Sequence, residues 1–160
     1  VVERELSHAG DAACVLPYDP DRRLALVITT PRIPVLQALG PGHPLAEAPA
    51  GMLDGDTPQA CVRREAMEEA GLQLRDLEPV ACVWPSPGTS MERISLYLAA
   101  YDAADRTGPG GGALGEHENI SVSEVPLAEL WASMGGEAAI DLKTLALVQA
   151  LRLRRPHLFE

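Results

Sequence analysis

The chain has 160 residues, enough for one domain with a buried core and too few for two ordinary domains. A hydrophobic content of 46% is typical of a folded globular protein rather than a disordered one. The formal net charge of −10 argues against nucleic acid as a partner, because binding to a phosphate backbone needs a basic surface. It does not exclude a small phosphorylated substrate, since a bound metal can supply positive charge locally.

The first part of the chain predicts a β-hairpin followed by a loop. The apolar runs 12–18 and 24–30 are typical of strands, and Asp19-Pro20-Asp21-Arg22 between them is strong turn chemistry. Residues 38–46 contain Gly and Pro and are predicted to form a loop.

The middle of the chain predicts a helix with recognisable ends. Thr57 is a good N-cap and Pro58 suits the first helical position. Gly71 suits the position that follows a helix, where a left-handed backbone is common. We therefore expect a helix from residue 58 to about residue 70.

The second half predicts further strands and two helices. The strands are expected at 79–84, 93–101 and 120–125, and the helices at 127–134 and 141–154. A turn at 86–89 and a long Gly-rich loop at 103–118 separate the strands. Strands on both sides of a central helix, with helices at the end, indicate one α+β layered domain over residues 1–160.

The cysteines and the apolar runs bear on where the protein works. Cys14, Cys61 and Cys82 are far apart and odd in number, and no two have metal-ligand spacing. We interpret them as buried free thiols, which is consistent with a reducing cytoplasm. No apolar run is long enough to span a bilayer and no signal peptide is visible, so we expect no membrane partner.

Three acidic residues in the predicted central helix are the most informative feature. Glu65, Glu68 and Glu69 stand at i, i+3 and i+4, which stacks three carboxylates on one face within a turn. Like charges at this spacing destabilise a helix unless they are neutralised, and hard divalent cations with oxygen ligands, Mg²⁺ above all, are suited to this. The alternative is a solvated charged helix face.

Residues 50–72 around these acids resemble the Nudix box, G-x5-E-x7-R-E-U-x-E-E-x-G-U, in which U is bulky and aliphatic. The second half matches at Arg64, Glu65, Glu68, Glu69, Gly71 and Leu72. In the first half the leading Gly position falls on Ala50, with Gly51 one place late, and the first Glu position falls on Asp56. The simplest account is a one-residue deletion in the loop between Gly51 and Asp56.

The resemblance implies a single Nudix hydrolase domain, with an α/β/α sandwich around a mixed central β-sheet. It implies that Glu65 and Glu69 are the principal metal ligands and that Glu68 is a secondary ligand or water contact. Arg64 would orient a carboxylate of the box. In many relatives the backbone carbonyl before the first Gly also binds metal, which here is Ala50. The implied cofactor is Mg²⁺, with Mn²⁺ as a substitute.

The resemblance extends beyond the box. Relatives that hydrolyse ADP-ribose or GDP-mannose share features at residues 10–20, at Arg32, at 86–93 and in an acidic loop at 116–120. The implied activity is Mg²⁺-dependent hydrolysis of the pyrophosphate bond of a nucleoside diphosphate sugar, of the ADP-ribose or GDP-mannose type. The products would be a nucleoside monophosphate and a sugar phosphate.

Further site residues follow from this class. A Glu of the acidic loop serves there as general base or orients the attacking water. Glu116 matches the base position and Glu118 lies beside it, with ordinary loop acids as the alternative. Arg32 and Glu92 match substrate-contacting positions. Arg4 would reach the terminal sugar or phosphate if the N-terminal segment folds back.

Two other functions stay open. One is a house-cleaning nucleoside triphosphate pyrophosphatase on the same fold, against which the features at 86–88 and 116–118 argue. The other is a non-catalytic Nudix domain that senses a nucleotide sugar, against which the intact triple carboxylate argues.

The N-terminus bears on a homodimer as partner. ADP-ribose-cleaving relatives usually carry an N-terminal β-segment that swaps across a homodimer and helps to hold the substrate. This chain begins where that segment would end, so an upstream segment was either removed or never existed. The homodimer therefore remains an expectation.

Overall fold

The computed structural model describes residues 2–43, 45–112, 119–135 and 140–160. Within them the strands form one mixed seven-stranded sheet, in the order β3-β2-β1-β6-β5, with β4 paired to β1 and β7 paired to β2. Strands β1 and β6 run parallel, whereas the other pairs are antiparallel. The strands are β1 (Ala12–Asp19), β2 (Leu24–Thr30), β3 (Leu45–Glu47), β4 (Ala50–Met52), β5 (Glu78–Val83), β6 (Ile94–Ala100) and β7 (Ser121–Pro126).

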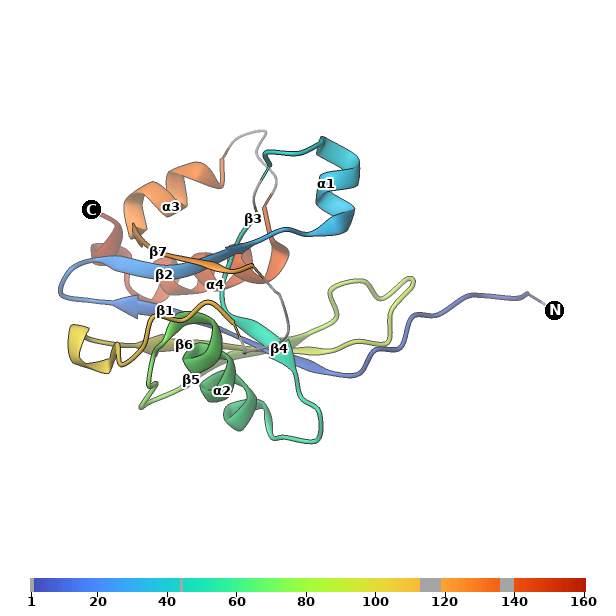
Figure 1. The fold of residues 1–160 in the computed structure, drawn as a ribbon, viewed down its shortest axis with the longest axis horizontal. Coiled ribbons are helices and arrows are strands. Elements are labelled where there is room, and N and C mark those ends of the chain that lie inside the picture. The colour runs from blue at the N-terminus through green and yellow to red at the C-terminus, as the bar shows by residue number, and fades with distance from the viewer. Residues whose placement is uncertain (1, 44, 113–118, 136–139) are drawn as a thin grey trace.

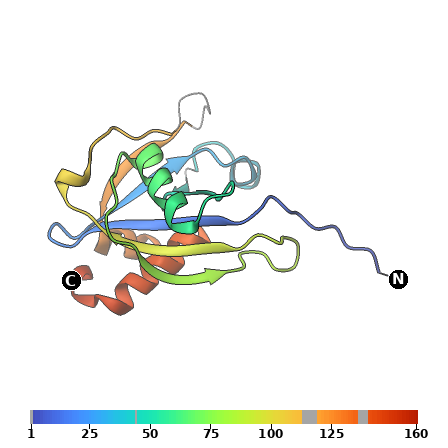
Figure 2. The same ribbon diagram turned by 90° about the horizontal axis from the view of Figure 1, so that it is seen from below.

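Helices cover both faces of this sheet. The α-helices are α1 (Ile33–Leu39), α2 (Pro58–Ala70), α3 (Leu127–Ser133) and α4 (Leu142–Arg154), and the 3-10 helices are η1 (Ala103–Asp105) and η2 (Pro156–Phe159). Helix α2 lies on one face and α4 on the other (Figures 1 and 2). The predicted α/β/α sandwich with a mixed central sheet is therefore confirmed. No helix in the described ranges is long and apolar enough to cross a membrane.

Strand β1 shows why the sheet needs cover on both faces. All of its residues are buried. Cys14 and Leu16 belong to the hydrophobic cluster under α4, whereas Ala13 and Val15 belong to the cluster under α2. Because successive side chains of a strand point to opposite faces, a strand buried on both sides is a continuous apolar run. Burial of each full aliphatic side chain contributes about 1.5–3 kcal/mol.

The predicted hairpin and central helix are confirmed. Strands β1 and β2 pair antiparallel around the turn, with Asp19 opposite Leu24. Helix α2 begins after Thr57, whose side chain accepts a hydrogen bond of 3.2 Å from the amide of Ala60. It ends at Gly71, which has a left-handed backbone with φ of 66°.

Two predictions about loops and thiols are wrong. The loop predicted over 38–46 contains the end of α1 at its start and the beginning of β3 at Leu45. Helix α1 has no buried residue and no side-chain cap, and its signals are limited to a proline in its first turn and Gly40 at its end. Cys82 is exposed rather than buried, because it lies on β5 at the edge of the sheet, where most positions are at least partly open to solvent.

The Gly-rich segment after η1 is attached to the end of α2. The amides of Gly111 and Gly112 donate hydrogen bonds to the carbonyl oxygens of Glu69 (2.9 Å) and Glu68 (3.0 Å). Gly110 permits this approach, because a Cβ at that position would lie 2.3 Å from the carbonyl oxygen of Glu69. The long loop predicted over 103–118 thus starts with η1. Its described part, which ends at residue 112, is hydrogen-bonded to the C-terminal end of α2.

Candidate active site

The last turns of α2 present two buried carboxylates. Glu65 and Glu69 are 9% and 4% exposed, although acidic side chains are rarely buried without partners. Both face strand β4. The amide of Ala50 donates a hydrogen bond of 3.0 Å to Oε2 of Glu69. A Cβ added at Gly51 would lie 1.9 Å from Oε1 of Glu65, so the strand and the carboxylate can approach only because residue 51 is glycine.

Strand β4 is held in place by the sheet. Gly51 pairs with Ala13, and Ala50 pairs with Cys14, in antiparallel register with β1. Gly51 is therefore the glycine of β4 that lies against Glu65. This agrees with a one-residue deletion in the loop between Gly51 and Asp56, and it makes Ala50 the residue before the glycine.

Arg64 joins the acids of this helix to β4. Its Nη1 lies 2.6 Å from Oε1 of Glu65 and 3.3 Å from Oε2 of Glu68. Its Nη2 donates to the carbonyl oxygen of Met52 at 3.1 Å, and its Nε lies 3.5 Å from Asp56. Partial burial lowers the pKa of Arg64, but the negative charges of Glu65 and Glu68 outweigh it, so the pKa lies above its ordinary value.

The carboxylates of α2 are not gathered around one point. Among the residues that the structure describes, no three His, Cys, Asp or Glu side chains lie close enough to hold a metal ion. Arg64 draws Glu65 and Glu68 toward itself, and the amide of Ala50 draws Glu69. The donor set nevertheless fits a hard divalent cation, because it consists of oxygens and because the absence of a Cβ at Gly51 lets the carboxylate of Glu65 lie directly against β4.

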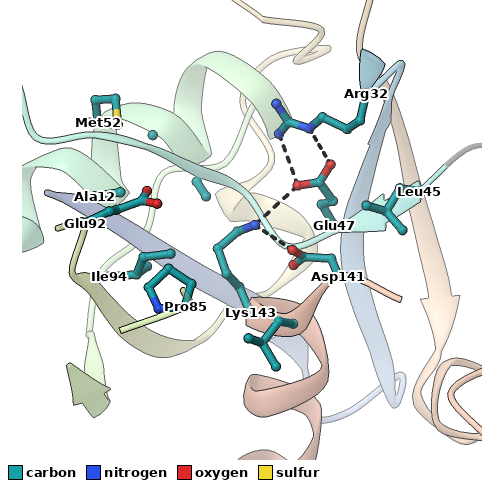
Figure 3. Close-up of a pocket in the computed structure, with 13 residues that line it drawn as sticks. Ala12, Arg32, Leu45, Glu47, Met52, Pro85, Glu92, Ile94, Asp141 and Lys143 are labelled. Atoms are coloured by element: carbon teal, nitrogen blue, oxygen red, sulfur yellow. Dashed lines mark hydrogen bonds and ion pairs between the residues drawn. The ribbon is translucent and has the colours of Figure 1, made fainter. Parts of the chain in front are cut away.

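A cavity of about 450 Å³ opens beside β4 (Figure 3). Three of the predicted site residues line it, namely Arg32, Ala50 and Glu92. Arg4 does not line it. It is exposed in the N-terminal segment 2–10, which extends away from the sheet (Figure 1).

The cavity also contains charged residues that sequence reasoning missed. Glu47 pairs with Arg32 at 2.6 Å and with Lys143 at 3.4 Å, and Lys143 pairs with Asp141 at 2.6 Å. Figure 3 shows this chain of ion pairs on one side of the cavity and Glu92 on the other. Asp141 could have been found as the N-cap of the last helix, whose side chain accepts a hydrogen bond from the amide of Thr144.

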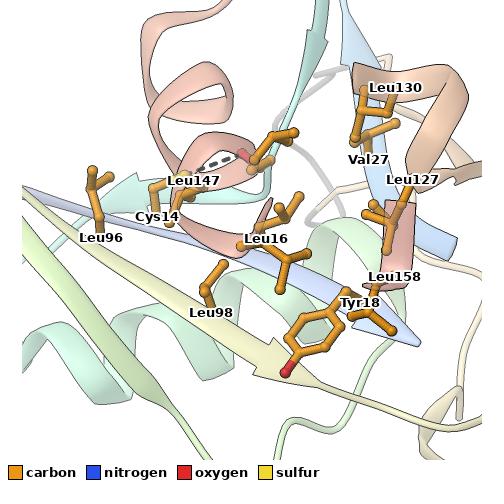
Figure 4. Close-up of a cluster of buried hydrophobic side chains, with 14 of the residues drawn as sticks. Cys14, Leu16, Tyr18, Val27, Leu96, Leu98, Leu127, Leu130, Leu147 and Leu158 are labelled. Carbon is orange, nitrogen blue, oxygen red and sulfur yellow. Dashed lines mark hydrogen bonds between the residues drawn. The ribbon is translucent and has the colours of Figure 1, made fainter. Parts of the chain in front are cut away.

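The core fixes the start of α4 at this cavity. Leu147, one turn after Lys143, is fully buried with Cys14 and Leu16 of β1 (Figure 4). Asp141 caps the helix, and burial, the largest influence on its carboxyl, raises its pKa. The charge of Lys143 and the hydrogen bonds from Lys143 and Thr144 together outweigh this, so the pKa of Asp141 lies below its ordinary value.

A family model described as NUDIX domain matches residues 8–147. The chain belongs to the Nudix family. It is similar to GDP-mannose pyrophosphatases of Cronobacter sakazakii (38% identical over 152 residues, covering 95% of this chain and 78% of the relative). Those of Pectobacterium atrosepticum (35% over 151 residues, 94% and 77%) and Yersinia enterocolitica (35% over 146 residues, 91% and 75%) are similar too.

These comparisons confirm what the resemblance implied about the family and the fold. The protein is a Nudix hydrolase. Members of the Nudix family generally use divalent metals, which agrees with the oxygen donors of α2. The matched region includes the whole Nudix box and all of the residues that line the cavity.

A buried thiol within the Nudix box, that of Cys61, contacts β4. Sγ of Cys61 donates to the carbonyl oxygens of Gly51 and Met52, both at 3.4 Å. Burial, followed by the charge of Glu65, raises the pKa of Cys61 to about 11. A thiol of this kind stays protonated near neutral pH and serves to join α2 to β4.

The two acids predicted to act as base, Glu116 and Glu118, lie outside the described residues. The structure describes both ends of the segment that carries them. On one side Gly112 is bonded to the carbonyl of Glu68, and on the other β7 begins at Ser121. The chain thus enters this segment from the C-terminal end of the Nudix helix.

Proposed function

We propose that this Nudix hydrolase cleaves the pyrophosphate bond of a nucleoside diphosphate sugar, of the GDP-mannose or ADP-ribose type. The observation that carries this proposal is the cavity, in which β4 beside the acidic helix faces a pair of cations, Arg32 and Lys143. Its volume of about 450 Å³ is in the range of small-molecule sites. The relatives named GDP-mannose pyrophosphatase support the substrate class.

Charge balance supports a requirement for Mg²⁺, with Mn²⁺ as a substitute. Both cations of the cavity are paired with Glu47 and Asp141, so they cannot neutralise the full charge of a diphosphate by themselves. Glu65, Glu69 and the carbonyl of Ala50 would hold the metal, with Glu68 as a further ligand or water contact. A bound divalent ion supplies charge neutralisation at the phosphates and activation of water.

The side chains of the protein have separate tasks in the proposed reaction. Arg32, Lys143 and Glu92 bind and orient the substrate from the walls of the cavity. Arg64 holds Glu65 and Glu68 in place through the contacts described above. Glu116, or Glu118 beside it, accepts the proton of the attacking water.

The bond changes are those of a hydrolysis. The water oxygen forms a bond to one phosphorus, and the bond from that phosphorus to the bridging oxygen breaks. The bridging oxygen leaves with the other phosphate, so the products are a nucleoside monophosphate and a sugar phosphate. Positioning and electrostatic stabilisation supply most of the rate in such transfers.

Product analysis tests this proposal. The purified protein is incubated with GDP-mannose or ADP-ribose and Mg²⁺, and products are separated by anion-exchange chromatography. We expect GMP with mannose 1-phosphate, or AMP with ribose 5-phosphate, in equal amounts. Release of inorganic phosphate without added phosphatase, or no cleavage of either compound, would contradict the proposal.

The compartment and the oligomeric state of the enzyme are a second part of the proposal. Cys14, Cys61 and Cys82 are free thiols, which supports a reducing cytoplasm. The exposed apolar side chains of Val2 and Leu6 on the extended N-terminal segment support a homodimer. Analytical ultracentrifugation at micromolar concentration would show about twice the monomer mass if the chain pairs, and the monomer mass if it does not.

A further inference from the structure

A single buried carboxylate connects the two cations of the cavity. Glu47, at the end of β3, is 2% exposed. Arg32 donates two hydrogen bonds to this carboxylate, from Nε to Oε1 at 2.6 Å and from Nη2 to Oε2 at 3.1 Å. Lys143 approaches the same carboxylate from α4, with Nζ 3.4 Å from Oε2. One acid therefore sets the separation of two cations that come from distant parts of the chain (Figure 3).

A second set of contacts fixes Lys143 independently. Its Nζ donates to Oδ1 of Asp141 at 2.6 Å. Oδ2 of Asp141 accepts from the amide and the hydroxyl of Thr144, at 2.8 and 2.7 Å. The hydroxyl oxygen of Thr144 in turn accepts from the amide of Ala48 at 2.7 Å, so the residue next to Glu47 is tied to α4 as well.

Burial of Glu47 and of most of Lys143 removes both charges from water, which carries a desolvation cost. Buried ion pairs lose much of their attraction to desolvation and are weak evidence for stability. Both cations are nevertheless held in their charged forms. The hydrogen bond with Glu47 raises the pKa of Arg32. Burial lowers the pKa of Lys143, but the charge of Asp141, its hydrogen bond and the charge of Glu47 contribute to a net rise. Groups that stay charged in a cavity despite this desolvation cost point to a ligand.

We propose that Glu47 is a positioning residue of the substrate site. It holds Arg32 and Lys143 at a fixed separation, as a two-cation clamp for the anionic part of the nucleotide sugar. The identity of that substrate rests on the proposed function, whereas the clamp itself requires only a ligand with two adjacent phosphate groups. Glu47 acts through the cations and does not contact the reacting atoms.

A positioning role and a pure charge role predict opposite changes in anion affinity when Glu47 loses its charge. Removing the negative charge of Glu47 makes the cavity more positive, so charge alone predicts tighter binding of an anion. A positioning role predicts weaker binding, because Arg32, whose side chain is 46% exposed, is released to solvent and must be ordered again by the ligand.

Variants of Glu47 test the proposal. Glu47→Gln keeps the shape and removes the charge. Glu47→Asp keeps the charge but is one methylene too short to meet both cations. Glu78→Gln is the matched control, since Glu78 also bridges two cations, Arg154 and Arg155, both at 2.6 Å, away from the cavity. Circular dichroism and thermal melting establish which variants are folded.

Two readouts keep this test separate from that of the proposed function. Calorimetric titration with inorganic pyrophosphate in metal-free buffer reports on the clamp alone. Steady-state kinetics with GDP-mannose and Mg²⁺ report KM and kcat. If the wild type cleaves no nucleotide sugar, the proposed function fails. The pyrophosphate titration still tests whether Glu47 positions the two cations.

We expect Glu47→Gln and Glu47→Asp to bind pyrophosphate about tenfold more weakly and to raise KM by a similar factor, with kcat changed by less than about threefold. Glu78→Gln should match the wild type in both. If Glu47→Gln does not fold, Glu47→Asp carries the test, because it retains the negative charge of the carboxylate. Equal or tighter binding by a folded Glu47 variant would overturn the proposal, as would a wild type that does not bind pyrophosphate.

Discussion

A Cβ added at Gly51 would lie 1.9 Å from Oε1 of Glu65, so the absence of a side chain on β4 is what lets the carboxylate of α2 occupy its place. Gly51→Ala must therefore move Glu65. The nearest atoms belong to the flexible end of a side chain, so the fold should survive while the site is displaced. We expect the melting temperature to change by a few degrees and kcat/KM to fall at least about 100-fold.

The control for this change is Gly88→Ala. A Cβ at Gly88 meets no atom within 4 Å, and its backbone is not left-handed. Both variants are assayed with the same nucleotide sugar and melted in the same buffer. An active Gly51→Ala enzyme would mean that Glu65 can work from another position.

Glu69→Gln probes the metal site. The substitution keeps the shape of the side chain and its acceptor oxygen for the amide of Ala50, and it removes the charge. We expect activity to fall at least about 100-fold with an unchanged melting temperature, together with weaker Mg²⁺ binding by calorimetry. Glu129→Gln, at an exposed acid of α3, should have no effect. Turnover near the wild-type rate at saturating Mg²⁺ would refute the assignment of Glu69.

Glu116→Gln tests the proposed general base. Loss of a base should lower kcat about 100- to 10,000-fold. Mg²⁺ affinity should hardly change, because the helix supplies the expected ligands. Glu118→Gln should matter less, or should show the larger loss if Glu118 is the base. Full activity in both single variants and in the double variant would place the base elsewhere in the protein.

Asp141→Asn tests the electrostatic part of the α4 cap as a function of pH. The folded pKa of Asp141 is lowered, so the unfolded carboxyl takes up its proton first, at about pH 4. Its stabilisation is therefore fully present above that pH and is lost as the pH falls through the folded pKa. Asn can still cap the helix. We expect the substitution to lower the free energy of unfolding by about 1–3 kcal/mol at pH 7, and by much less at pH 3. A difference that stays constant with pH, measured by urea unfolding, would show that the charge is not responsible.

Much of the fold was predictable because its signals are local. Thr57, Pro58 and Gly71 mark the two ends of α2 in the sequence, and the structure places them there. The short strands β3 and β4 were not found, since three residues are too few for a periodic pattern and their pairing with β2 and β1 is a tertiary event.

The site was predictable only where a motif carried it. Arg32, Ala50 and Glu92 were expected and do line one cavity. Glu47 and Lys143 were not expected, because they are 96 positions apart and meet only when α4 packs across β3. No local pattern marks either residue, whereas their contact is evident once the sheet and helix are assembled.

The preference between nucleotide sugars and nucleoside triphosphates tests the central claim most directly. The measurement is kcat/KM for GDP-mannose, ADP-ribose, ATP and dGTP, side by side on one preparation with saturating Mg²⁺. We predict that GDP-mannose or ADP-ribose is the best substrate by at least about tenfold, since the cavity brings β4, which lies beside the acidic helix, together with the cations of Arg32 and Lys143. If ATP or dGTP is the best substrate, or if the nucleotide sugars bind without being cleaved, the account is wrong.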